Sequence, residues 1–101
     1  MKYLVTARPG TTTIKLKYGA QLFQAAKEWV NARLADGAFD CHYAFVDLGG
    51  FSISNAETPE AAYDMVLDYP LYPFFEWTVE PIFDWQYAYD KNIAYFKKFG
   101  K

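Results

Sequence analysis

The segment Tyr69 to Trp85 reads YPLYPFFEWTVEPIFDW, and it decides the fold. Residues 70 to 73 hold two of its three prolines, which predicts a bend where a helix has just ended. From Phe75 to Phe83 apolar and polar residues alternate, with Phe75, Trp77 and Val79 opposed to two glutamates and a threonine, which predicts a strand. A helix, a bend and a strand therefore follow one another here.

The elements upstream follow from the same periodicities. Residues 2 to 8 alternate as a strand, and Pro9-Gly10 end it. A long amphipathic helix comes next and closes at Gly37; its start stays open, because residues 13 to 18 also alternate like a strand and Gly19 weakens a helix. Its apolar face is formed by Leu22, Phe23, Ala26, Trp29, Val30 and Leu34.

A hairpin and two further helices complete the chain. Residues 38 to 46 and 51 to 54 are predicted strands joined through Gly49-Gly50. Thr58 is a typical N-cap, with a proline at the first helical position, and Pro70 is expected to stop this second helix. A terminal helix begins at Trp85, and its apolar spacing runs through Tyr89, Ile93 and Phe96.

This order of elements predicts the architecture. A strand–helix–strand unit repeated twice, with the central strands linked as a hairpin, is the ferredoxin-like βαββαβ arrangement. We therefore expect an α+β fold, in which one antiparallel sheet carries two helices on one face, followed by the C-terminal helix. With 101 residues, 52% of them hydrophobic, residues 1–101 are expected to form a single domain.

The face of the sheet that the helices leave uncovered indicates a partner. It is too polar for a dry core and too apolar for comfortable solvation, and two such faces packed across a twofold axis would form a dimeric α+β barrel. We therefore expect a homodimer through the sheet face. Residues assigned to this face are Leu4, Thr6, His42, Ala44, Val46, Ser52, Glu76, Thr78 and Glu80.

The run from Ile53 to Val79 resembles the second half of muconolactone isomerases, members of the dimeric α+β barrel superfamily. The resemblance rests on Pro59-Glu60 at the helix entry and on the Pro-Leu-aromatic-Pro-aromatic pattern of residues 70 to 74. It implies a dimer, or an assembly of dimers, with a pocket between sheet and helices. The second strand and the terminal helix after Trp85 depart from the family pattern, so the resemblance implies the fold and not the isomerase activity.

Composition excludes several partners. The formal net charge of −2 offers no basic face for a phosphate backbone, so nucleic acid is not expected. No segment reads as a signal peptide or membrane span, and the single Cys41 fits a reducing compartment, so we expect a cytoplasmic protein with no membrane partner. No glycine-rich phosphate loop follows a strand, and no convergent metal ligands occur; neither cofactor nor metal is expected, although haem ligation by His42 alone stays open.

Aromatic residues make up 21% of the chain, more ring surface than a small monomer readily buries. The excess indicates a dimer interface, a ligand cavity or both. A cavity between sheet and helices would hold a flat hydrophobic or aromatic-like ligand, with tyrosine hydroxyls bonding its oxygens; the alternative is an ordinary core. The expected lining is Tyr3, Phe23, Phe39, Tyr43, Phe51, Tyr63, Tyr72 and Trp77, with Arg8 either binding a carboxylate or simply lying at the surface.

His42 is the only histidine, and its ordinary pKa suits proton transfer near neutrality. Asp40 lies two residues away on the same face of the predicted strand and would orient the imidazole, while Tyr72 would polarise a substrate oxygen. Cys41 would point the opposite way, as a core cysteine. The alternative for His42 is a dimer-interface histidine bonded to a glutamate of the partner.

These residues favour a small cofactor-independent enzyme that moves a proton in a hydrophobic or aromatic-like metabolite, as an isomerase or cyclase does. Two alternatives stay open. One is a non-catalytic ligand-binding or accessory module, and the other is a cofactor-independent monooxygenase.

Overall fold

A four-stranded antiparallel sheet in the order β2-β3-β1-β4 carries the fold. The computed structural model describes residues 1–100. The strands are β1 (Lys2–Pro9), β2 (Phe39–Ala44), β3 (Gly50–Asn55) and β4 (Phe75–Ile82). Because β1 lies between β3 and β4 and pairs antiparallel with both, this is the ferredoxin-like sheet that the order of elements predicted.

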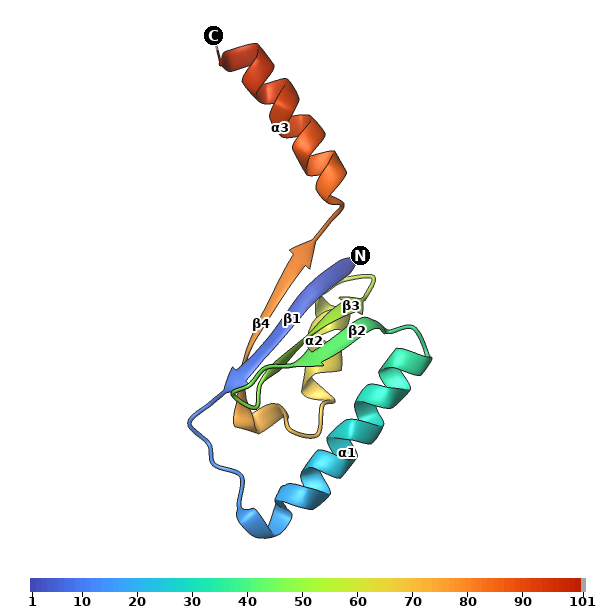
Figure 1. Ribbon diagram of the computed structural model, residues 1–101. Helices are drawn as coiled ribbons and strands as arrows, with labels where there is room; N and C mark the ends of the chain where they lie inside the picture. The colour runs from blue at the N-terminus through green and yellow to red at the C-terminus, as the bar shows by residue number, and fades with distance from the viewer. Residues whose placement is uncertain (101) are drawn as a thin grey trace.

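Two helices lie on one side of the sheet and a third extends from the end of β4 (Figure 1). The helices are α1 (Leu16–Ala35), α2 (Pro59–Leu67), the short 3-10 helix η1 (Tyr72–Phe74) and α3 (Trp85–Phe99). The hydroxyl of Thr58 accepts a hydrogen bond from the Ala61 amide at 3.1 Å, so the predicted N-cap is confirmed. The helix α2 ends at Leu67, before Pro70, because the residue preceding a proline also disfavours helical backbone.

The dry core lies between α2 and the β1–β4 half of the sheet. Tyr3 and Val5 of β1 pack with Ala62 and Val66 of α2, and Trp77 and Val79 of β4 pack against this cluster. The inward face of β4 is therefore core, as its alternation predicted.

A β-bulge changes which residues of β2 face the helices. In the β2–β3 register Phe39 lies opposite Ser54 and Cys41 lies opposite Ile53, so Asp40 is an extra residue. Phe39 and His42 consequently point to the same side, toward the helices, although they are three residues apart. The prediction that His42 lies on the uncovered face is wrong.

The central strand β1 fixes the orientation of β3. Val5 packs in the core and pairs with Ser52, while Thr6 pairs with Phe51, so Ser52 faces the helices and Phe51 faces away. The uncovered face, called the outer sheet face below, bears Leu4, Thr6, Arg8, Cys41, Tyr43, Phe51, Ile53, Asn55, Glu76, Thr78 and Glu80.

The predicted uncovered face was therefore right for β1 and β4 and wrong for the hairpin. Leu4, Thr6 and the three polar residues of β4 do lie on it. His42, Ala44 and Ser52 instead face the helices, and Val46 lies beyond the end of β2. The rings of Tyr43 and Phe51 were assigned to the core because they are hydrophobic. The register of β3 on β1 and of β2 on β3 instead places both on the outer sheet face.

The helix α3 stands away from the remaining elements (Figure 1). Of its 15 residues all except Ala88 are exposed, and the molecule measures 64 × 29 × 23 Å along its principal axes. Asp84 caps its start by accepting a hydrogen bond from the Gln86 amide at 3.3 Å.

Candidate functional site

A pocket of about 300 Å³ lies between α1 and the inward face of β2 and β3. It exists because the inward side chains there are small: Ala44, Gly50, Ser52 and Ser54 stand where large residues would otherwise fill the space. The cavity extends from α1 to α2, since Ala62, Met65 and Val66 also line it, and the filled core around Tyr3 lies on the far side of these residues.

His42 provides the reactive group of the pocket. Its Nδ1 atom is shielded from solvent and has no hydrogen-bond partner among residues 1–100. The imidazole stacks on the Phe39 ring, with centroids 6.0 Å apart and planes 14° apart. Burial lowers the pKa of His42 below its ordinary value of 6.5, because the low-dielectric surroundings disfavour the cation. At neutral pH the pocket therefore contains an uncharged imidazole, able to accept a proton.

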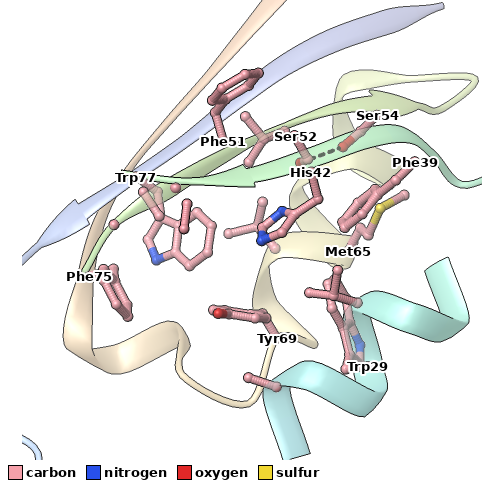
Figure 2. Close-up of a pocket in the computed structure, with 18 of the residues that line it drawn as sticks. Trp29, Phe39, His42, Phe51, Ser52, Ser54, Met65, Tyr69, Phe75 and Trp77 are labelled. Carbon is pink, nitrogen blue, oxygen red and sulfur yellow. Dashed lines mark hydrogen bonds between the residues drawn. The ribbon is translucent and has the colours of Figure 1, made fainter. Parts of the chain in front are cut away.

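Aromatic rings form the wall opposite the sheet. Tyr69 meets Trp29 of α1 edge to face at 5.3 Å and Trp77 of β4 at 5.5 Å. Figure 2 shows the Tyr69 hydroxyl and the His42 ring directed into the same space. Burial raises the pKa of Tyr69, so its hydroxyl stays protonated and available as a hydrogen-bond donor.

Other polar groups of the pocket already have partners. The indole N–H of Trp29 donates to the Asp68 carboxylate at 2.8 Å, and that of Trp77 donates to the Tyr72 carbonyl at 3.0 Å. The hydroxyls of Ser52 and Ser54 lie 3.2 Å apart and bond to each other. His42 and Tyr69 are therefore the pocket groups best placed to bond a ligand.

The mouth of the pocket lies between α1 and the β2–β3 hairpin, where the exposed lining residues occur. Lys27 and Asn31 line it on the helix, together with the partly exposed ring of Phe23. Lys27 is the one lysine or arginine of this lining, which includes no Asp or Glu. A ligand would meet a cation at the entrance and apolar surface with a neutral imidazole inside.

Three predicted lining residues, Phe39, Phe23 and Trp77, do line the pocket, in keeping with the expected convergence of aromatic side chains between sheet and helices. His42 lines it as well, although it was expected on the uncovered face. What each does there is not decided by its position.

Three predicted residues lie on the outer sheet face instead. Tyr43 stacks on Phe51 at 5.7 Å, and Figure 2 shows the Phe51 ring on the far side of the sheet, although its strand borders the pocket. Arg8 lies 3.9 Å from the centroid of the Phe45 ring and pairs with Asp47 at 3.2 Å. It is a surface arginine and not a pocket anion site.

Asp40 cannot orient His42, because the bulge turns it outward. Its carboxylate pairs with Lys2 and accepts a hydrogen bond from Asn55 at 2.7 Å; these contacts lower its pKa, the Lys2 hydrogen bond most strongly. The expected Asp40–His42 pair is therefore wrong.

Three tyrosines lie away from the pocket. Tyr3 is fully buried in the core, and its hydroxyl lies 3.5 Å from the Met1 sulfur. Tyr63 is exposed on α2. Tyr72 stacks on Trp77 at 6.1 Å and is absent from the pocket lining, so its side chain supports the wall from behind.

Among the pocket residues that were not predicted from the sequence are Trp29, Tyr69, Met65, Phe75 and the two serines of β3. Trp29 had been assigned to the apolar face of the first helix and Tyr69 to the end of the second, before the bend. Both side chains turn toward the same sheet. Trp29 and Tyr69 could have been predicted to meet, because two helices that cover one face of a sheet also lie side by side. The direction of the Ser52 and Ser54 side chains could be predicted only with the β1–β3 register known.

Within residues 1–100 no group of three or more His, Cys, Asp or Glu side chains could hold a metal ion. No helix in that range is long and apolar enough to cross a membrane. Cys41 is partly buried and lies on the outer sheet face.

Comparison with solved structures defines the class of fold. The chain superposes on muconolactone isomerase with a TM-score of 0.72, at 17% identity, covering 83% of this chain and 90% of that one. A second match is 5-chloro-2-hydroxyhydroquinone dehydrochlorinase from Burkholderia phenoliruptrix, in complex with 2,5-dihydroxybenzoquinone. Its TM-score is 0.69 at 15% identity, over 86% of this chain and 98% of that chain. No family model and no curated protein matches the sequence.

The chain thus has the ferredoxin-like α+β fold of these proteins. Its particular fold is that of muconolactone isomerase, as the resemblance of residues 53 to 79 implied. At these identities the likeness concerns the fold alone.

Proposed function

We propose that this protein is a small enzyme that moves a proton within a flat, hydrophobic or aromatic-like metabolite, using His42 as the base. The observation that carries the proposal is the buried, unpartnered Nδ1 of His42 in an apolar pocket of about 300 Å³. Leaving a buried polar atom unsatisfied costs about 1–3 kcal/mol, a cost that a ligand hydrogen bond would remove.

The proposed chemistry follows from two polar groups of the pocket, the His42 imidazole and the Tyr69 hydroxyl. Neutral His42 would take a proton from an acidic C–H beside a carbonyl group, and the electron pair would move onto the carbonyl oxygen. The protonated Tyr69 hydroxyl would donate a hydrogen bond to that oxygen and stabilise its charge. Imidazolium would then return the proton to another carbon of the conjugated system, so the net reaction is an isomerisation that needs no oxidant.

The walls favour a planar ligand. Trp29, Tyr69 and Trp77 present ring edges and faces around a space whose floor is small side chains, which suits a single ring or a conjugated chain. Lys27 at the mouth would favour a carboxylate or phenolate at the outer end of the ligand.

We also propose that the working unit is a homodimer that packs through the outer sheet face. Tyr43, Phe51, Ile53 and Leu4 place apolar side chains on a face that no helix of this chain covers. A second copy would cover them and form the barrel.

A thermal-shift screen tests the proposal. Hydroxylated quinones, phenols and unsaturated lactones are screened, starting with 2,5-dihydroxybenzoquinone, and a ligand of the pocket should raise the unfolding temperature. The proton-transfer step is then followed by exchange of solvent deuterium into the bound ligand. His42→Gln should abolish the exchange, whereas binding should weaken far less.

Tyr43→Phe is the matched control, because it lies next to His42 in β2 and points to the opposite face. It should leave exchange unchanged. If His42→Gln exchanges deuterium as fast as the wild type, the catalytic role of His42 is wrong. A ligand that binds and never exchanges would instead support the ligand-binding module.

A further inference from the structure

The helix α3 has one apolar and one polar face, and both are exposed. At helical spacing Trp85, Tyr89, Asn92 and Phe96 share one side, which Ala88, Ile93, Tyr95 and Phe99 widen. A shallow groove on this side is lined in part by Tyr89, Asn92, Ile93 and Phe96. Gln86, Tyr87, Asp90, Lys91, Ala94, Lys97 and Lys98 lie on the other side, with Tyr87 as its one aromatic ring and Lys97 at the edge of the groove.

The chain exposes too much surface for a molecule of its mass. Its accessible surface is 7491 Å², whereas a compact monomer of 11.7 kDa exposes about 5,900 Å². The radius of gyration is 17.3 Å, against about 13 Å for a compact domain of this length. The excess of about 1,600 Å² arises largely because α3 packs on no other element (Figure 1).

We propose that α3 is a self-association helix, which pairs antiparallel with α3 of a second copy of the chain. Asn92 is the midpoint of the helix and the one polar residue within its apolar face. An antiparallel pair centred there places the two Asn92 amides against each other on the twofold axis, where each satisfies the other and fixes the register.

The same arrangement matches the other residues in size. Trp85 lies opposite Phe99 of the second helix, Tyr89 lies opposite Tyr95, and the small Ala88 lies opposite the large Phe96. Ring therefore meets ring in two of these pairs, and the small Ala88 leaves room for the Phe96 ring in the third.

Charge also favours the antiparallel direction. Asp84 precedes the first residue of α3, and Lys97 and Lys98 occupy its last turn. Antiparallel pairing brings the acidic start of each helix beside the basic end of the other, whereas parallel pairing would place like charges together.

The area is adequate for a stable contact. Five aromatic side chains of the apolar face are between 56% and 66% exposed. At ~150–250 Å² for each ring, they offer roughly 600 Å² per chain, or roughly 1,200 Å² for the pair, which reaches the range of specific interfaces. The inference does not depend on what binds in the pocket.

Substitutions in the full chain test the contact. Phe96→Glu places a charge in the apolar face and should raise the dissociation constant for α3-mediated association by about tenfold or more, measured by sedimentation equilibrium. Ala94→Glu is the matched control, because it adds the same charge on the polar face, and it should leave association unchanged. If Phe96→Glu associates as the wild type does, the proposal is overturned.

Cysteine cross-linking tests the direction, in a Cys41→Ser background. Asn92→Cys should form an intermolecular disulfide under mild oxidation, because it lies on the axis. Ala88→Cys should form it at least about tenfold more slowly, since antiparallel pairing separates the two positions by about 12 Å. Equal cross-linking at both positions would contradict the antiparallel pair.

A membrane surface is the competing occupant of an amphipathic helix with lysines on its polar face. Vesicles of one-third anionic lipid are pelleted with the wild-type chain and with Phe96→Glu. Self-association is overturned if the wild-type chain shows no association through α3, pellets with the vesicles, and loses this vesicle binding in Phe96→Glu. A chain that associates through α3 and stays in the supernatant supports it.

Discussion

His42 combines three properties that seldom occur together in one side chain: burial, a missing hydrogen-bond partner and a ring stacked on a neighbour. It is also the single histidine, so no other imidazole titrates in the folded or unfolded chain. Its protonation can therefore be followed without interference from a second one.

Stability should fall as the pH falls below about 6.5 because of His42. Burial lowers its folded-state pKa below the ordinary value of 6.5, so between these two values the unfolded chain binds more protons than the folded one. The free energy of unfolding therefore decreases with falling pH through that window and gains nothing from His42 above it. Urea unfolding between pH 5.5 and 8 measures this.

His42→Gln should flatten that part of the pH profile, because glutamine does not titrate. The difference between the two curves isolates His42, since most carboxylates titrate at lower pH. A wild-type profile that is parallel to that of His42→Gln between pH 5.5 and 7 would contradict a buried neutral imidazole.

Tyr69→Phe should separate the hydroxyl from the ring. The ring contacts with Trp29 and Trp77 survive, so the free energy of unfolding should change by less than about 1 kcal/mol. Affinity for an oxygen-bearing ligand should fall about fivefold, the value of one hydrogen bond of about 1 kcal/mol. Calorimetric titration with the ligand from the thermal-shift screen measures this. Tyr63→Phe, on exposed α2 surface, serves as control.

At the scale of elements, the β2–β3 hairpin is the most tightly fitted connection. A Cβ atom at Gly49 would lie 2.2 Å from the Ala7 carbonyl oxygen of β1, and at Gly50 it would lie 2.7 Å from the Tyr43 carbonyl oxygen. Neither backbone oxygen can move without breaking the sheet. Glycine at these positions therefore lets the hairpin lie against β1 and form the pocket floor.

Gly49→Ala and Gly19→Ala should act in opposite directions. The first introduces a backbone clash and should destabilise the fold by about 2 kcal/mol or more. The second lies inside α1, where the nearest contact would be an ordinary 4.0 Å to Ile14, and should stabilise by about 0.5–1 kcal/mol. Thermal unfolding of both variants checks this; two shifts of the same sign would contradict the close approach.

The elements could be predicted from the sequence because periodicity and caps act locally. The Thr58 cap, the strand beginning at Phe75 and the terminal helix at Trp85 all appear in the structure. The bulge at Asp40 could not be predicted, because it depends on pairing with β3. One extra residue then exchanged the faces of His42 and Tyr43, which moved the catalytic candidate into the pocket and a predicted lining residue out of it.

At the scale of the whole molecule, the sheet divides into two functional halves. Beneath α2 the β1–β4 half holds the core cluster around Tyr3, which supplies stability, and Val5 and Val66 at the edge of this cluster also line the pocket. Beneath α1 the β2–β3 half is lined by small residues and leaves the pocket. The free energy gained by packing the first half therefore offsets the cost of leaving a cavity in the second half.

Tyr43→Glu should weaken the proposed sheet-face dimer. Tyr43 is 63% exposed in the single chain, so the substitution should cost the monomer little, whereas a charge buried at a twofold contact is repelled by its own copy. Light scattering should show a lower mass at equal concentration. Val46→Glu, beyond the end of β2, is the matched control, and equal masses for Tyr43→Glu and wild type would contradict this interface.

The placement of the three tryptophans makes the molecule its own optical reporter. Trp29 and Trp77 wall the pocket, while Trp85 begins α3, beyond the end of β4 and outside the pocket lining. A quinone-like ligand should quench the emission of the first two, and self-association should shift the emission of the third to shorter wavelength. In Trp85→Phe only the ligand signal should remain, so the two events can be read separately in unlabelled protein.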